Sequence, residues 1–439
     1  MRSIADELGL DVDREHDLIA LAQYHLNERG GRHRINQLLL TEFTKNAKLT
    51  ENHKILAGLP VKTYWTTNYD KLIELALQQA RKTPDVKITS DNLATNLPRR
   101  DAVVYKMHGD VSQPESAVAT KDDYEAYNQS RQLFSTALQG DLVSKTFLFL
   151  GLSFSDPNLD YILSRIRVLL GQNRRDHYCL MKRIHRSNFT TKEKYIYAKT
   201  KQELQVKDLR RYGITGVLVD NYGDYTEVLR RIDLRFRRTR VFISGSAATY
   251  EPWSAEEVQS CIEKMAAMLI ERGYQIVSGF GLGIGSSVIN GVLQQLKSMN
   301  STAIDERLIL RPFPQYSPSS KNLKDHWKEY REEIVPLAGI AIFLFGNKKA
   351  ENGTLLNATG VLEEFEVAAQ HGLILIPVGA TGYASAILHQ KVLDNFESYY
   401  GKDSGLKSKF RDLMKPEKEL HRVSKKVVDF VDEVRKKNL

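Results

Sequence analysis

Polar side chains that could bind a ligand follow three apolar runs in the first half of the sequence. Asn68 lies in "TTNYD" (66–70), His108 lies in "KMHGD" (106–110), and "GLSFSDPN" (151–158) follows the third run. A buried strand has little use for such groups unless something polar docks at its end. Histidine titrates near neutral pH, which suits a general base. These clusters are therefore candidates for a site that binds and acts on a polar ligand.

Taken one at a time, these residues also have structural explanations. Asn68 and Asp70 could cap the next helix, and His108 could be a satisfied core histidine. All three clusters, however, come at the ends of apolar runs. Parallel strands present their carboxyl ends at one edge of a sheet, where ligands bind. Together the clusters favour a binding site over separate structural roles.

The elements that must position these residues alternate between strands and helices. Residues 1–58 look helical, and the alternation then begins; it restarts after the basic run "LRRIDLRFRRTR" (229–240). Such alternation predicts parallel sheets with helices on both faces. We expect an α/β fold class with two doubly wound parallel-sheet (Rossmann-like) domains, residues 1–236 and 237–439. We interpret the basic run as a solvated segment that joins the two domains.

The second half carries a Gly-rich loop and a set of charged residues. "QIVSGFGLGIGSS" is typical of a strand, a loop and a helix start, where glycines allow close backbone approach and helix amides attract an anion. A second Ser-Gly turn lies in "VFISGSA". A cation at a strand end and a carboxylate in the first turn of a helix suit a phosphate and a ribose hydroxyl. The candidate ligand-binding residues are Ser244, Gly245, Gly281, Gly283, Gly285, Arg331, Lys348 and Glu363.

The composition of the chain excludes several classes of protein and of binding site. The 439 residues include 63 Lys and Arg against 54 Asp and Glu, and the formal net charge of +9 favours anionic partners only weakly. Cys179 and Cys261 lie far apart, which excludes a disulfide framework and a cysteine-rich zinc site. Membrane-spanning, signal-peptide and nucleic-acid-binding patterns are not found. We expect a cytoplasmic protein with no metal, no nucleic-acid partner and no membrane association.

The motifs "TxNYD" and "KxHGD", followed by an apolar strand ending in "GxS", resemble the sirtuin-like NAD-binding domains of bacterial defence proteins. The resemblance implies that Asn68 orients the nicotinamide ribose and a water, that His108 is the general base, and that Asp70 buttresses the site. Cleavage of the N-glycosidic bond passes through an oxocarbenium-like state, which needs positioning and a base. Without a four-cysteine zinc module, NAD+ hydrolysis is expected rather than protein deacetylation. The residues implied to contact NAD+ are Thr66, Asp70, Gly151 and Ser153.

The second half resembles the SLOG domains, which are relatives of the "lonely guy" nucleotide hydrolases and sense nucleotide second messengers. A sirtuin-like domain followed by a SLOG domain resembles the effectors of the Thoeris anti-phage system. This resemblance implies a cyclic ADP-ribose isomer as activator, made by a partner TIR-domain protein and bound with its phosphates at the Gly-rich loop. It also implies a homo-oligomer, a tetramer formed through the sirtuin-like domains.

One motif of the sirtuin-like family has no match in residues 1–60, namely a first strand with a Gly-rich turn whose amides hold the NAD phosphates. We expect the sequence to start downstream of that motif. Two other functions stay open. The chain could be a non-catalytic nucleotide sensor or scaffold. Alternatively, the second domain could be a nucleotide phosphoribohydrolase, whose "PGGxGT" signature is only faintly matched by "NATGVLEE".

Overall fold

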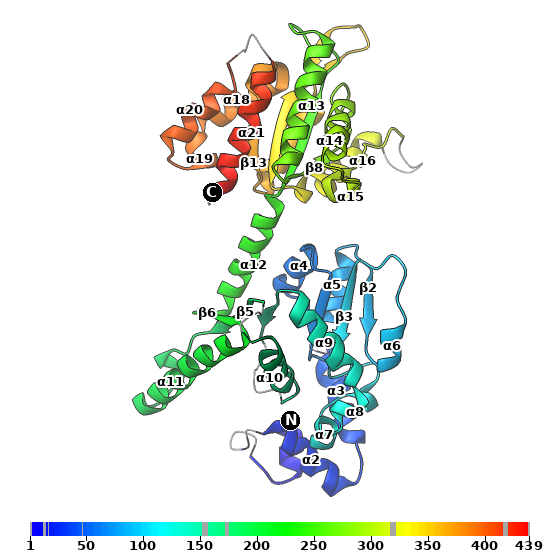
Figure 1. Cartoon of the computed structure of the whole chain (residues 1–439), viewed down its shortest axis with the longest axis vertical. Coiled ribbons are helices and arrows are strands. Elements are labelled where there is room, and N and C mark those ends of the chain that lie inside the picture. The colour runs from blue at the N-terminus through cyan, green and yellow to red at the C-terminus, as the bar shows by residue number, and fades with distance from the viewer. Residues whose placement is uncertain are drawn as a thin grey trace. The chain divides into compact units, whose positions relative to one another are not determined.

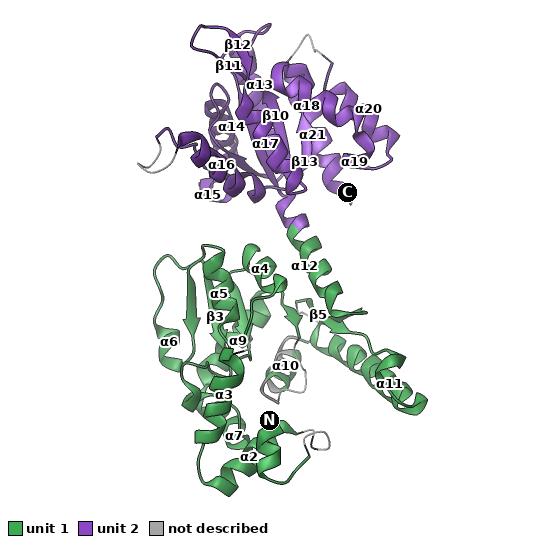
Figure 2. Cartoon of the chain, turned by 180° about the vertical axis from the view of Figure 1, so that it is seen from behind, with its two compact units in different colours: residues 1–233 green, residues 234–439 purple. Residues whose placement is uncertain are grey.

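The computed structural model describes residues 2–11, 15, 17–45, 47–151, 157–171, 175–316, 322–415 and 420–437. The chain divides into two compact units, residues 1–233 and 234–439, shown in Figure 2. Both units combine helices with parallel strands (Figure 1), so the predicted α/β fold class is confirmed. The basic run expected to be a solvated segment lies mostly within helix α12 (Tyr222–Arg237), where Leu229 is fully buried.

Unit 1 holds two three-stranded parallel sheets, ordered β1-β3-β2 and β4-β5-β6, where the sequence suggested one. Among the described residues β1 pairs only with β3, and β4 only with β5, so no backbone hydrogen bonds join the sheets. Side chains join them instead, because Trp65 packs against the core that contains Phe149. The elements are α1 (Arg2–Glu7), α2 (Leu18–Arg29), α3 (His33–Lys45), α4 (Glu51–Gly58), β1 (Thr63–Thr66), α5 (Leu72–Gln79), β2 (Pro84–Lys87), α6 (Ser90–Ala94), β3 (Ala102–Lys106), α7 (Lys121–Glu125), α8 (Tyr127–Ser130), α9 (Gln132–Ser144), β4 (Leu148–Leu150), α10 (Pro157–Leu170), β5 (His177–Lys182), α11 (Lys192–Leu209), β6 (Ile214–Val219) and α12.

Unit 2 is built on one five-stranded parallel sheet, ordered β13-β10-β7-β8-β9, with a separate antiparallel pair, β11 and β12. Helices α13 and α14 lie over one face of the large sheet (Figure 1), and α17 lies over the other (Figure 2). The elements are β7 (Arg240–Ser246), α13 (Ala255–Glu271), β8 (Gln275–Ser278), α14 (Gly285–Ser298), α15 (Ile304–Arg307), β9 (Leu308–Leu310), α16 (Leu323–Ile334), β10 (Ile340–Phe345), β11 (Asn347–Lys349), β12 (Leu355–Asn357), α17 (Thr359–Gln370), β13 (Ile374–Pro377), α18 (Tyr383–Asp394), α19 (Phe396–Tyr400), α20 (Ser404–Asp412) and α21 (His421–Lys436).

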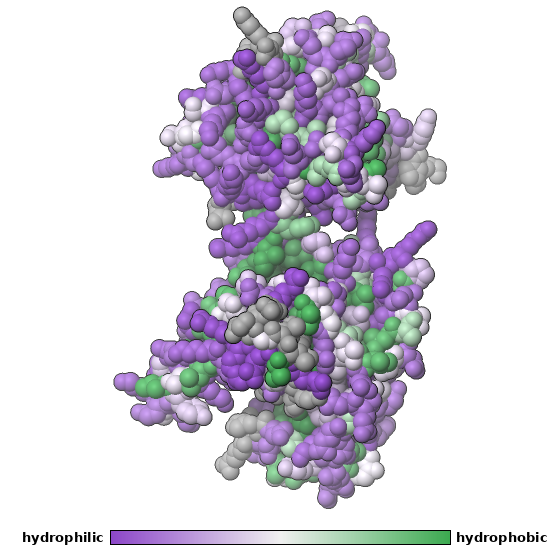
Figure 3. All heavy atoms as spheres, viewed as in Figure 1, coloured by the Kyte–Doolittle hydropathy of each residue, from purple (hydrophilic) through white to green (hydrophobic). Residues whose placement is uncertain are grey.

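The core of unit 2 follows from this layered arrangement. All six residues of β10 and all four of β13 are buried, as expected for parallel strands covered on both faces. A capping box starts α13: the Ser254 hydroxyl accepts from the Glu257 amide at 3.2 Å, and the Glu257 carboxylate accepts from the Ser254 amide at 2.9 Å. Hydrophilic residues cover most of the face of unit 2 seen in Figure 3. Among the described helices, none has both the length and the apolar character that a membrane span requires.

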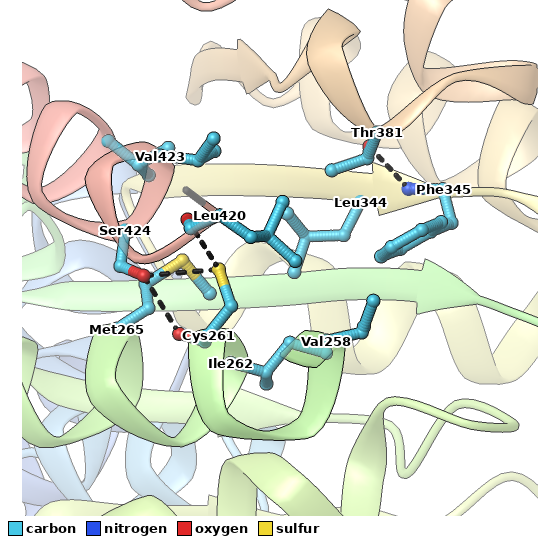
Figure 4. Close-up of a pocket in the computed structure, with 11 residues that line it drawn as sticks. Val258, Cys261, Ile262, Met265, Leu344, Phe345, Thr381, Leu420, Val423 and Ser424 are labelled. Carbon is cyan, nitrogen blue, oxygen red and sulfur yellow. Dashed lines mark hydrogen bonds between the residues drawn. The ribbon is translucent and has the colours of Figure 1, made fainter. Parts of the chain in front are cut away.

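Both cysteines are free and buried. Cys261 of α13 donates to the carbonyl oxygen of Leu420 at 3.3 Å, and its sulfur lies 3.1 Å from the hydroxyl of Ser424 on α21 (Figure 4). Burial raises the pKa of the Cys261 thiol, although Ser424 opposes this shift. The cavity beside this thiol measures about 10 Å³, which is room for at most one water. It is a packing gap between α13 and α21.

Candidate functional site

The strand-end site of unit 1, which we define as residues 66–70 and 106–110, is formed by two neighbouring parallel strands. Thr66 of β1 pairs with Lys106 of β3 in register. The pairing continues beyond the strands, because the amide of Met107 donates to the carbonyl oxygen of Thr66 at 2.9 Å. Asn68 and His108 each lie two residues past the Thr66–Lys106 pair. The structure therefore brings the two predicted catalytic residues to adjacent strand ends.

The loop that carries Asn68 is shaped by its own side chains. The amide of Asn68 donates to the hydroxyl of Thr66 at 3.0 Å, and the Asn68 residue is exposed. Asp70 accepts from the amide of Leu72 at 2.9 Å, just at the start of α5. Asp70 thus holds the junction between this loop and the helix. That contact is the helix-capping role that the sequence also allowed for Asp70, and its buttressing role and its contact with NAD+ stay predictions.

His108 is held rigidly, with only 4% of its surface exposed. Its ring contacts the rings of Tyr124 and Tyr127 edge-on, at centroid distances of 5.5 and 6.3 Å. The next residue, Gly109, has φ of +94°, and a Cβ there would lie 3.0 Å from the Cα of Ala117. Glycine is therefore required in the "HGD" turn, and the turn fixes where the imidazole lies.

The third predicted strand end lies in the other sheet of unit 1. Gly151 follows β4 with φ of +62°, a conformation that favours glycine. Ser153 lies outside the described residues. Phe149 of β4 shares a core with Met107, so this strand end lies in the same unit and packs on the same core as the "KMHGD" turn. No metal-binding group of three His, Cys, Asp or Glu side chains occurs within the part of the chain that the structure describes.

The cleft of unit 2 is a cavity of about 1120 Å³, on the scale of pockets that hold nucleotide-sized ligands. Its walls come from the carboxyl end of β7, the Gly-rich loop, α16, β11 and the start of α17. The predicted residues that line it are Ser244, Gly245, Gly281, Arg331, Lys348 and Glu363. Gly283 and Gly285 are not among its lining residues.

Backbone packing explains the glycines of the loop after β8. A Cβ on Gly281 would lie 2.0 Å from the carbonyl oxygen of Gly245, and one on Gly283 would lie 2.3 Å from that of Ala247. A Cβ on Gly285 would lie 2.7 Å from the ring of Phe280. Gly281 and Gly283 thus let the loop press against the end of β7. Of these three glycines only Gly281 lines the cleft, so the structure gives Gly283 and Gly285 packing roles.

The charged side chains of the cleft are unevenly paired. Arg331, only 7% exposed, donates through Nη1 to Oε2 of Glu363 at 2.5 Å, and its guanidinium lies 5.4 Å from the ring centroid of Phe313. Lys348 is exposed and donates to the hydroxyl of Thr359 at 3.3 Å. Lys324 and Lys328 of α16 also line the cleft. The cleft thus has four cationic side chains, against the five carboxyl groups of Asp325, Glu332, Glu363, Glu364 and Glu366. Its arginine and lysine side chains are groups that bind phosphates.

Comparison with known proteins identifies the family. The SIR2-like domain family matches residues 62–206, and the Sir2- and TIR-associating SLOG family matches residues 224–434. NAD(+) hydrolase ThsA of Bacillus cereus (strain MSX-D12) is 47% identical over 434 residues, which is 98% of this chain and 90% of the relative. The chain belongs to the ThsA family. Further members are NAD(+) hydrolase ThsA of Cytobacillus dafuensis, 45% identical over 99% of this chain and 89% of the relative, and that of Enterococcus faecium, 47% identical over 97% and 89%.

These matches confirm the sirtuin-like and SLOG resemblance inferred from the motifs. The relatives are named for the hydrolysis of NAD+. The matched SIR2-like segment contains the strand-end site, and the matched SLOG segment contains the cleft. The roles of individual residues are not tested by these comparisons and stay predictions.

The sequence analysis missed Lys106, which ties the strand-end site together. Its side chain is fully buried, and its ammonium lies 2.6 Å from Oδ2 of Asp110 and 3.1 Å from Oε1 of Glu74. It also donates to the carbonyl oxygens of Tyr69 and Asp70. One ammonium therefore binds the loop after β1, the turn after β3 and helix α5.

The pKa values of the two carboxylates around Lys106 shift in opposite directions. Burial pushes the pKa of Asp110 upward, but hydrogen bonds from Lys106 and Ser112 outweigh it and the net shift is downward. Burial raises the pKa of Glu74, and the nearby ammonium only partly opposes this. Asp110 is thus the stable ionic partner of Lys106. In the structure of "AVVYK" the residues Ala102, Val104 and Lys106 are buried, so strand alternation places Lys106 on the buried face, whereas the residue types alone do not alternate.

Glu364 was also missed, and it lies in the wall of the cleft. It is 8% exposed and accepts from the hydroxyl of Ser244 at 2.5 Å. Burial raises its pKa to about 7, although Ser244 and Arg331 oppose the shift. Val361, Glu364, Phe365 and Ala368 form the buried stripe of α17. The sequence carried this signal as helical spacing, because position 364 falls on the apolar face.

Proposed function

We propose that this chain hydrolyses NAD+ to ADP-ribose and nicotinamide at the strand-end site, and that a cyclic ADP-ribose isomer bound in the cleft of unit 2 switches this activity on. The observation that carries the proposal is 47% sequence identity, over 98% of this chain, to the relative named NAD(+) hydrolase ThsA of Bacillus cereus (strain MSX-D12). The nucleotide-sized cleft in the SLOG segment, with Arg331 and Lys348 in its walls, supports the second half of the proposal.

In the proposed reaction, nicotinamide leaves the ribose with the bonding electron pair, and water adds to the same carbon. His108 takes the proton of that water, directly or through a ribose hydroxyl, while the Asn68 amide orients the ribose and the water. A leaving group that departs early generates positive charge on the sugar, so positioning matters more than strong nucleophilic attack. The rigid setting of His108 between Tyr124 and Tyr127 suits this demand.

The wider role that we propose is NAD+ depletion in bacterial anti-phage defence, in the cytoplasm. A TIR-domain protein would supply the cyclic ADP-ribose isomer as a diffusible signal, without forming a stable complex. The description of the matched family as Sir2- and TIR-associating supports this pairing. We further propose that the working form is a homotetramer.

Nicotinamide release tests the catalytic half of the proposal. Purified chain is incubated with NAD+ alone and with each of a panel of cyclic ADP-ribose isomers, and nicotinamide is quantified by chromatography. We expect release that depends on one isomer. Tight binding of an isomer with no release under any condition would instead favour a non-catalytic sensor.

Substitutions at the strand-end site test the residue assignments. Asn68→Ala and His108→Ala are each expected to lower turnover by at least about a hundredfold, the usual effect of losing a general base or a positioning group. The matched controls are the exposed Asn128→Ala on α8 and His33→Ala on α3, which should leave turnover unchanged. Equal losses in the variants and their controls would contradict the assignments.

A further inference from the structure

The carboxyl group of Glu364 is poorly compensated for a buried acid. It lies in the wall of the cleft with 8% exposure. The one nearby guanidinium, that of Arg331, bonds Glu363 at 2.5 Å, whereas its Nε lies 3.9 Å from Oε1 of Glu364. That second distance is beyond hydrogen-bond range. A buried carboxylate that lacks a close cation favours its neutral form.

Other charged groups on the elements around Glu364 are directed to other partners. On α17 itself, Glu366 pairs with Lys391 of α18 at 2.6 Å. On α16, Glu332 pairs with His371 at 3.0 Å. Strands β10 and β13, which pack against α17, have no titratable side chain. Strand β7 and helix α18 also pack against α17, but Arg240 of β7 donates to Gln275 and to the carbonyl oxygen of Leu337, and His389 of α18 bonds the carbonyl oxygen of Phe410. Arg331 and Glu363 are therefore the charges that act on Glu364, as its raised pKa of about 7 reflects.

As a neutral carboxylic acid, Glu364 can donate a hydrogen bond to a ligand in the cleft. Oε2 already accepts the Ser244 hydrogen at 2.5 Å, so a proton on the carboxyl group can be donated to a bound molecule. A nucleotide with a pyrophosphate brings negative charge close to Arg331 and Lys348. Such a ligand is repelled by ionised Glu364 and attracted by its neutral form.

We propose that Glu364 is an additional ligand-contacting residue, which binds the nucleotide as a neutral carboxylic acid and donates a hydrogen bond to it. Nucleotide binding is then coupled to uptake of a proton by this side chain. The proposal rests on the proposed function of the cleft as a site for a cyclic ADP-ribose isomer, and it adds a residue and a proton to that site.

Proton uptake by Glu364 makes ligand affinity depend on pH in one direction. Above the pKa of Glu364 the free protein must take up a proton before it binds, so affinity falls as the pH rises. With a pKa of about 7 in the free protein, the affinity is about tenfold weaker at about pH 8 than at about pH 6, and about one proton is taken up per ligand at the higher pH. Below about pH 6 the affinity no longer changes with pH, because the group is already neutral.

Isothermal titration calorimetry of the full chain tests this coupling. A panel of cyclic ADP-ribose isomers is screened first, and the tightest binder is titrated at about pH 6 and about pH 8 in buffers of different ionisation enthalpy. The slope of the heat against buffer enthalpy counts the protons taken up. Glu364→Gln keeps a neutral donor and an acceptor for Ser244, so we expect binding that is as tight as wild type at low pH and unaffected by pH.

The control is Glu397→Gln, which removes the same charge from an exposed position of α19 that does not line the cleft and should retain the wild-type pH dependence. A second variant, Ser244→Ala, removes a bond that lowers the pKa of Glu364 and should move the midpoint of the pH dependence upward. Thermal melting verifies that each variant is folded.

The outcomes separate this inference from the proposed function. If wild type binds no isomer at any pH, the proposed ligand of the cleft is wrong. If wild type binds an isomer without proton uptake, or Glu364→Gln keeps the same pH dependence, Glu364 is not the coupled group. Failure of folded Glu364→Gln to bind at low pH also overturns the inference, because the neutral amide should replace the neutral acid.

Discussion

The strand-end site and the cleft both bury charged side chains, but they compensate these charges differently. In the strand-end site the buried ammonium of Lys106 has the Asp110 carboxylate at 2.6 Å and the carbonyl oxygens of Tyr69 and Asp70 around it. In the cleft, the Nε of buried Arg331 has no hydrogen-bond partner among the described residues, and Glu364 lies 3.9 Å from it. The ammonium of Lys106 is satisfied by the protein alone, whereas the guanidinium of Arg331 has a donor left for a ligand.

This difference suits the two proposed tasks. A hydrolytic site needs groups held in one geometry before the substrate arrives, and the interactions of Lys106 supply that. A ligand-sensing site needs groups whose interactions improve when the ligand binds, because a ligand shifts an equilibrium only through contacts that differ between states. The incompletely paired groups Arg331 and Glu364 provide such contacts.

The largest expected effect on stability comes from removing the ammonium of the strand-end site. Lys106→Met removes the close cation of the buried Asp110 carboxylate, leaving it Ser112 and the more distant Lys71 at 3.9 Å, and should lower the free energy of unfolding of unit 1 by about 3 kcal/mol or more. Urea titration with hydrogen exchange and mass spectrometry measures this, since peptides of the two units are then read separately. The control Lys121→Met, whose side chain is 64% exposed, should change stability by less than about 0.5 kcal/mol. Equal effects would show that the buried pairing contributes little.

The second largest effect on stability is expected from the carboxyl group of Glu364 in the cleft. Burial raises the pKa of Glu364 from 4.5 to about 7, so the folded state holds this proton more tightly than the unfolded chain. Its contribution to stability is therefore lost as the pH rises from about 4.5 to about 7, a loss of about 3 kcal/mol. Glu364→Gln should remove this part of the pH dependence and gain stability over wild type above about pH 7. Denaturation series at several pH values measure it, and an unchanged pH profile would contradict the raised pKa.

A smaller effect on the free energy of unfolding is expected from the contact between the Gly-rich loop and β7. Gly281→Ala puts a Cβ 2.0 Å from the carbonyl oxygen of Gly245, so the loop must move, at a cost of about 1–3 kcal/mol. In contrast, Gly405→Ala within α20 meets its nearest atom at 3.5 Å and should stabilise by up to about 1 kcal/mol. Calorimetric melting of both variants compares them. The same sign for both would show that the loop tolerates displacement.

The smallest effect on stability should come from the rim of the cleft. Lys348 is exposed, so Lys348→Met should change the free energy of unfolding by less than about 0.5 kcal/mol but weaken binding of the cyclic ADP-ribose isomer about fivefold to tenfold at low salt. Titration calorimetry at low and high salt measures both the loss and its screening. Lys349→Met is the control, because successive side chains of a strand point to opposite faces. Equal losses at both positions would argue against a specific contact by Lys348.

The sequence predicted the α/β fold class and the family because these depend on local patterns. Apolar runs that end in polar clusters, such as "TTNYD" and "KMHGD", predict strand ends, and in the structure Asn68 and His108 do lie at adjacent ends. The division of the unit 1 strands into two sheets was not predicted. Which strand pairs with which depends on contacts between distant parts of the chain, such as that of Trp65 with the core around Phe149.

The missed residues share a cause. Lys106 and Glu364 are charged, and a charged residue is by default assigned to the surface. Burial of a charge depends on partners from other elements, which a single sequence does not pair. The ammonium of Lys106 meets Asp110 of its own turn but also Glu74 of α5, and Glu364 meets Ser244 of β7, 120 positions away. In the structure both residues lie on the buried face of their strand or helix, although a charged residue type would place them at the surface.

The hydrogen bond between Cys261 and the residues around the start of α21 makes this thiol a chemical reporter. Leu420 and Ser424 enclose the sulfur, and burial holds its pKa above the usual thiol range, so an alkylating reagent reaches a thiolate there only after the last helix has come away from α13. The labelling rate of Cys261 therefore measures how often the carboxyl-terminal helix detaches, and a ligand that tightens unit 2 would slow it.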